Sequence, residues 1–150
     1  MARYNTIFAG PVSEPLPQVQ ERTCAATVLP GTALVESGSA FAQAGASTNA
    51  KVYIAAENFL CLKDVDTVWA IGESIVGYEL LDEQLFNARV PTSTNVARGA
   101  ALTTNSSGKF VLATTTGQRI IAFAEEAYNN TSGADQLVRV RKAQSNLAVA

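Results

Sequence analysis

The chain has 150 residues, the length of one ordinary domain, so it can bury a hydrophobic core without a metal ion or a disulfide framework. Hydrophobic residues make up 47% of the chain and charged residues only 16%, against about 25% in typical soluble domains, which suits a protein that lies in an assembly. The formal net charge of −2 lacks the basic excess on which nucleic-acid binding depends, so no direct nucleic-acid partner is expected.

Residues 1–22 are predicted to form an extended N-terminal arm. The segment contains Pro11, Pro15 and Pro17, and proline fixes φ and removes an amide donor, which excludes a helix or a central strand. Apolar side chains on such an arm must be buried, either on their own domain or across a neighbouring chain, and both alternatives stay open. The residues expected to dock the arm on a partner are Tyr4, Ile7, Phe8 and Leu16.

Residues 23–143 are predicted to form a β-rich domain of short segments. The stretch RTCAATVL (22–29) is β-permissive and ends at a Pro-Gly turn, and KVYIAAEN (51–58) has the β-branched and aromatic character of a strand. The stretch FLCLKDVDTVWA (59–70) is ambiguous between a helical turn and a loop. ESIVGYELL (73–81) reads as a strand in which Gly77 is a candidate bulge.

The C-terminal third has the clearest strand pattern. ALTT (101–104) and KFVLATT (109–115) are predicted to form a hairpin through the loop 105–108, in which Gly108 takes a positive φ. QLVRVRKA (136–143) alternates apolar and basic residues, so its two arginines should line a solvated strand face.

Short segments spaced about 8–12 residues apart indicate an all-β architecture. The predicted fold is mainly β: a single small β-sandwich or β-barrel (jelly-roll-like) domain with an extended N-terminal arm. Residues 144–150 are expected to form a C-terminal tail.

No catalytic constellation is present in the sequence. The chain has no histidine, which removes the commonest general base and metal ligand, and no glycine-rich phosphate loop. Asp64, Asp66 and Glu125 lack the neighbours of a calcium or hydrolase site and are interpreted as surface charges. We therefore expect no enzyme activity, no catalytic residues, no metal site and no cofactor.

The remaining special residues have structural interpretations. Cys24 and Cys61 are expected to be small buried apolar side chains, with a disulfide as the alternative. Trp69 is expected to be a core residue or an interface anchor. No apolar run reaches the length of a membrane span and no signal-peptide run is visible at residues 1–17, so we expect cytoplasmic synthesis and no membrane partner.

Several motifs resemble the decoration (cement) proteins of bacteriophage capsids. The stretches that carry the resemblance are LPGTALVESGSAFAQAG, GESIVGYEL and, above all, residues 95–127. The last of these matches a family pattern of a turn, a Gly-Lys hairpin and a strand, at Val96, Arg98, Gly99, Leu102, Gly108, Lys109 and Ile120 to Glu126.

This resemblance implies a structural protein that binds the outer surface of a phage head and bridges major-capsid subunits to stabilise the shell. The expected partner is the major capsid protein, with the chain as a homo-oligomer (dimer or trimer) on the virion capsid surface after synthesis in the bacterial host cytoplasm. The alternative is a carbohydrate-binding or adhesin-like β module on a virion or cell surface, for which the sequence shows no aromatic platform.

Overall fold

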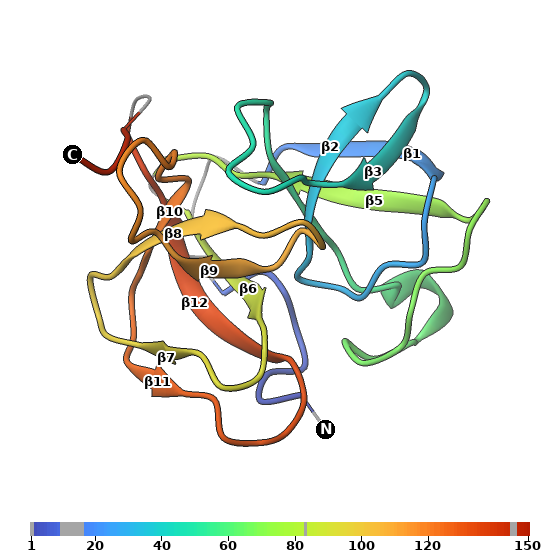
Figure 1. The fold of residues 1–150 in the computed structure, drawn as a ribbon. Coiled ribbons are helices and arrows are strands. Elements are labelled where there is room, and N and C mark those ends of the chain that lie inside the picture. Colours follow the sequence, from blue (N-terminus) through green and yellow to red (C-terminus); the bar gives the residue numbers. More distant parts are fainter. Residues whose placement is uncertain (1, 10–16, 83, 145–146) are drawn as a thin grey trace.

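Short strands account for nearly all regular structure in the computed structural model, which describes residues 2–9, 17–82, 84–144 and 147–150 (Figure 1). The blue-to-green strands form a barrel at the right of Figure 1, and the yellow-to-red strands form a second sheet beside it. The predicted small, mainly β domain is thus confirmed, with a barrel as its closed part.

The barrel strands follow one another in the order β1-β3-β2-β4-β5. Their bounds are β1 (Val19–Cys24), β2 (Ala33–Ser37), β3 (Ala40–Gln43), β4 (Tyr53–Ala55) and β5 (Ser74–Glu79). β1 pairs antiparallel with β5 on one side and parallel with β3 on the other. The ring of strands therefore closes, and it leaves no open edge for pairing with another chain.

The second sheet has the order β6-β12-β10-β8-β9, and a ribbon of β11 and β7 lies next to it. The bounds are β6 (Leu85–Val90), β7 (Asn95–Val96), β8 (Ala101–Thr104), β9 (Phe110–Leu112), β10 (Ala122–Ala124), β11 (Tyr128–Asn129) and β12 (Gln136–Lys142). The longest ladder joins β6 to β12, from Gln136 opposite Val90 to Arg141 opposite Leu85.

Two hydrophobic clusters hold these layers together. The smaller one fills the barrel and includes Cys24, Phe41 and Trp69. The larger one contains Ile54 from the barrel and Phe86 from the second sheet, so the barrel and the second sheet pack against each other through it. The barrel and the sheet therefore share one core.

The hairpin predicted around residues 105–108 is confirmed, and its tip joins the two layers. Gly108 has φ +68°, and the carbonyl of Lys109 accepts a hydrogen bond of 2.9 Å from Asn105 N. The carbonyl of Gly108 accepts a hydrogen bond of 2.8 Å from Ala33 N in β2. A Cβ at position 108 would lie 2.5 Å from the Ala33 carbonyl oxygen, so the close approach of hairpin and barrel requires glycine.

Two local expectations were wrong in detail. Gly77 pairs in regular register with Gln20 and Ala55 rather than forming a bulge. Its missing side chain leaves space for the Phe41 ring, because a Cβ at position 77 would lie 3.0 Å from that ring. Cys61 is exposed rather than buried; it and buried Cys24 are both free.

The alternation predicted for residues 136–143 is observed in β12. Val138 and Val140 are buried, while the guanidinium groups of Arg139 and Arg141 lie 5.7 Å from the centre of the Tyr4 ring and 4.7 Å from that of Phe123. Both arginines thus cover aromatic rings on the outer face of the strand.

Candidate contact surface

Three of the four residues expected to dock on a partner, Tyr4, Ile7 and Phe8, pack on their own chain. Ile7 is fully buried, and its carbonyl accepts a 2.7 Å hydrogen bond from Asn87 N in β6. Phe8 bridges to Phe86 and lies between that ring and Tyr78, with ring centroids 6.0 and 6.4 Å away. Since Tyr78 belongs to β5 and Phe86 to β6, Phe8 fills the junction of barrel and sheet.

Tyr4 is also held within the chain. Its hydroxyl donates a 2.6 Å hydrogen bond to Glu126 Oε2, and the guanidinium of Arg3 lies 5.2 Å from its ring centre. Burial raises the pKa of Tyr4, and the Glu126 carboxylate raises it further.

Leu16 lies outside the described residues, and β1 already begins at Val19, inside the segment 1–22 expected to be an arm. Contact of Tyr4, Ile7 and Phe8 with another chain stays a prediction. Their packing on this chain, however, corresponds to the first of the two alternatives left open by the sequence.

A different segment exposes apolar side chains. We call residues 57–73 the apolar loop; it connects β4 to β5, contains the short 3₁₀ helix η1 (Phe59–Cys61), and lies at the lower right of Figure 1, away from the C-terminus. Its exposed large side chains, with their exposed fractions, are Phe59 (52%), Leu60 (80%), Leu62 (94%), Val68 (44%) and Ile71 (69%). Large apolar side chains exposed together mark interaction surfaces in soluble proteins.

Local hydrogen bonds shape the tip of this loop. The Asn58 side chain accepts a 3.2 Å hydrogen bond from Cys61 N and caps η1, and Leu62 ends the turn with φ 52°. Asp64 then accepts hydrogen bonds from Asp66 N and from the Thr67 hydroxyl, and the latter lowers the pKa of the Asp64 carboxyl. The tip is therefore a set of capped turns with its apolar side chains pointing outward.

The base of the loop is anchored in the core. Trp69 is buried and donates a 2.8 Å hydrogen bond from Nε1 to the Ala56 carbonyl. Arg89 of β6, only 2% exposed, donates to the Val65 carbonyl at 2.6 Å and to the Pro30 carbonyl at 2.9 Å, and pairs with Asp66 at 3.4 Å. Burial lowers the pKa of Arg89, and these oxygen partners offset the cost of its buried charge.

A shallow cavity of about 220 Å³ lies between the loop and the barrel wall. Its lining includes Phe59, Leu60 and Trp69 from the loop, and Glu21 and Val76 from β1 and β5. The anchored base and the adjoining cavity make the apolar loop a preformed surface.

Two of the carboxylates that could serve as catalytic or metal-binding groups, Asp66 and Glu125, are engaged in ion pairs instead. Asp66 pairs with Arg89, and Glu125 pairs with Arg141. Within the described part of the chain, no group of three or more Cys, Asp or Glu side chains is placed to hold a metal ion. Over the same residues no helix is long and apolar enough to cross a membrane.

Sequence reasoning did not identify the apolar loop. In the sequence, the run Phe59 to Leu62 is ambiguous between a helical turn and a loop. A usable signal was present, because four successive apolar residues without strand alternation are followed directly by a segment with three charged residues, Lys63, Asp64 and Asp66.

Comparison with known proteins supports the fold. No family model and no curated protein matches the sequence. Among solved structures, the chain is similar to the N base of the head fiber gp8.5 of bacteriophage phi29, with a TM-score of 0.58 and 15% identity. The alignment covers 88% of this chain and 98% of that one, so the two share a fold over nearly the whole of the phi29 domain.

Proposed function

We propose that this chain is a structural protein of a bacteriophage head, which binds the outer capsid surface and bridges major-capsid subunits to stabilise the shell. The observation that carries the proposal is the fold shared with the N base of a phage head fiber. The motif resemblance to capsid decoration proteins, centred on residues 95–127, supports the same role.

In this proposal the apolar loop is the capsid-binding surface. Leu60 and Leu62 present most of their surface to solvent, while Trp69 and Arg89 hold the base of the loop. Binding would bury these side chains without first ordering the loop, which keeps the entropic cost low. Many copies on one shell would add such modest contacts together. The protein would act without catalysis, as a homo-oligomer on the virion after synthesis in the host cytoplasm.

Co-sedimentation with phage heads assembled without this chain tests the proposal. The wild-type chain should pellet with the heads, and the double variant Leu60→Ser, Leu62→Ser should bind at least about tenfold more weakly, since each leucine contributes about 1 kcal/mol or more when buried. Val19→Ser is the matched control, because Val19 is 60% exposed but lies on β1 outside the loop. Failure of the wild-type chain to bind heads would reject the proposed function. If the double variant binds heads as tightly as the wild-type chain, the apolar loop is not the capsid-binding surface.

The structural match also favours a second candidate, a base that fixes a projection to the head without strengthening it. Thermal stability of the heads separates the two. Heads carrying the chain should rupture at a higher temperature than bare heads if it bridges capsid subunits, and at the same temperature if it serves only as an attachment base.

A further inference from the structure

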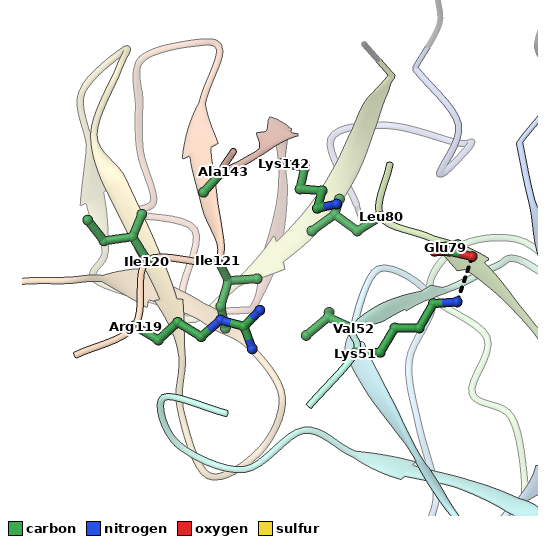
Figure 2. A pocket seen from close by; sticks show the side chains of 9 residues that line it. All are labelled: Lys51, Val52, Glu79, Leu80, Arg119, Ile120, Ile121, Lys142 and Ala143. Atoms are coloured by element: carbon green, nitrogen blue, oxygen red, sulfur yellow. Dashed lines mark ion pairs between the residues drawn. The ribbon is translucent and has the colours of Figure 1, made fainter. Parts of the chain in front are cut away.

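A second hollow lies between the barrel and the second sheet, away from the apolar loop. Figure 2 shows this cavity, which has a volume of about 300 Å³. Residues just before β4 and at the end of β5 face residues just before β10 and at the end of β12. The lining residues are Lys51, Val52, Glu79, Leu80, Arg119, Ile120, Ile121, Lys142 and Ala143.

Among the described residues that line this cavity, positive charge exceeds negative charge. Lys51, Arg119 and Lys142 supply three cations, while Glu79 is the carboxylate in the lining. Glu79 is already engaged, because its Oε2 lies 2.9 Å from Lys51 Nζ, a contact that raises the pKa of Lys51. Among the described residues, no carboxylate lies within ion-pair distance of Arg119 or Lys142, so no carboxylate of this part of the chain compensates either cation.

Hydrogen bonds within the chain hold Arg119 in place and leave some of its guanidinium donors unused. Its Nη1 donates to the carbonyls of Thr48 at 3.2 Å and Ala50 at 3.1 Å, and its backbone N donates to Ser47 Oγ at 2.8 Å. Its Nη2 has no acceptor in the described chain, and its Nε is buried without one. A guanidinium held by neutral carbonyls and with unused donors is preorganised for an anion.

The floor of the cavity is apolar. Val52, Leu80, Ile121 and Ala143 are all buried, and Figure 2 shows the charged ends of Arg119 and Lys142 near these side chains. Charge interactions are stronger beside such low-dielectric walls than in open water. The floor would also contact the methylene groups of a ligand, which a bare inorganic anion lacks.

We propose that this cavity binds the carboxylate side chain of an acidic peptide segment on a partner protein. Arg119 and Lys142 would pair with the carboxylate, and the apolar floor would cover the aliphatic part of the side chain. A polyanion such as nucleic acid is disfavoured by the Glu79 carboxylate in the lining and by the net charge of −2. The charges of the cavity would select such a segment whether or not the partner is a capsid protein.

Titration of the ¹⁵N-labelled protein with an acetylated hexaglutamate peptide, followed by NMR, tests the site. Saturable shifts should appear at the amides of Val52, Ile121 and Ala143, and hexaglutamine should produce none. Lys142→Gln should weaken binding at least about tenfold, the loss expected for one charge-assisted contact. Arg119→Gln should weaken peptide binding to the same extent. If Arg119→Gln does not fold, Lys142→Gln by itself tests the site.

Arg98→Gln is the matched control, because it removes one positive charge from a side chain that is 76% exposed and outside the cavity lining. It should leave binding unchanged. Equal weakening by Arg98→Gln, shifts spread over the surface, or no saturation would each overturn the proposal. Inorganic phosphate or single-stranded DNA that displaces the peptide at equal concentration would overturn it as well, because the site would then recognise charge alone.

Discussion

Replacement of Ile7 by alanine should destabilise the whole domain, although Ile7 lies in a segment that the sequence marks as an arm. Ile7 is fully buried in the core that barrel and sheet share. The substitution removes three carbons, worth about 2.4 kcal/mol at about 0.8 kcal/mol each, and the cavity left behind raises the loss in unfolding free energy to about 3–4 kcal/mol. For a domain of this size, that loss lowers the Tm by roughly 6–16 °C.

Urea unfolding monitored by Trp69 fluorescence and by far-ultraviolet circular dichroism measures this loss. Trp69 is the chain's single tryptophan and belongs to the barrel cluster, whereas Ile7 belongs to the shared cluster. Coincident shifts in both signals would show that the two clusters unfold together. Val19→Ala, at a position 60% exposed, should change stability by less than about 0.5 kcal/mol.

A loss below about 1 kcal/mol with an unchanged denaturant slope would refute the packing of residues 2–9 on their own domain. If the loss is observed, deletion of the N-terminal segment becomes a poor test of partner binding. Such a deletion would remove Ile7 and Phe8 from the core, so it would weaken the fold together with any contact that the segment makes.

A pair of glycines and a half-buried tyrosine give two further predictions. Gly108→Ala should lower the free energy of unfolding by more than about 2 kcal/mol, because φ is +68° and the new Cβ would lie 2.5 Å from the Ala33 carbonyl oxygen. Gly117→Ala should lower it by only about 1 kcal/mol, because φ is +84° but the space around the new Cβ is open. Equal losses in thermal unfolding would contradict the contact between Gly108 and Ala33. Burial, with a smaller effect of Glu57, raises the pKa of Tyr78 to about 12, so its hydroxyl ionises in the unfolded chain near pH 10 before it does so in the folded one. Stability should therefore fall as the pH rises from about 10 to 12, and this fall should be smaller in Tyr78→Phe; identical pH profiles would show that the hydroxyl is not buried.

The sequence alone determined the class of the fold and several of its local parts. Strand spacing predicted the mainly β domain, the Asn105 to Gly108 turn predicted a hairpin with a positive φ at Gly108, and alternation placed Val138 and Val140 on the inner face of β12. These features depend on side-chain period and turn chemistry, which are properties of neighbouring residues and can be read without knowledge of the rest of the chain.

The tertiary structure alone decided which apolar residues are buried. Ile7 and Phe8 lie on a proline-containing segment yet enter the core, while Leu60 and Leu62, from an equally apolar run, stay in solvent. Likewise, Arg89 can be buried in a strand because its guanidinium donates hydrogen bonds to the carbonyls of Pro30 and Val65, which lie in turns far away in the sequence. Composition shows which side chains favour burial. Which of them are buried depends on contacts between residues far apart in the chain, and these contacts are determined only by the closed barrel and its packing on the second sheet.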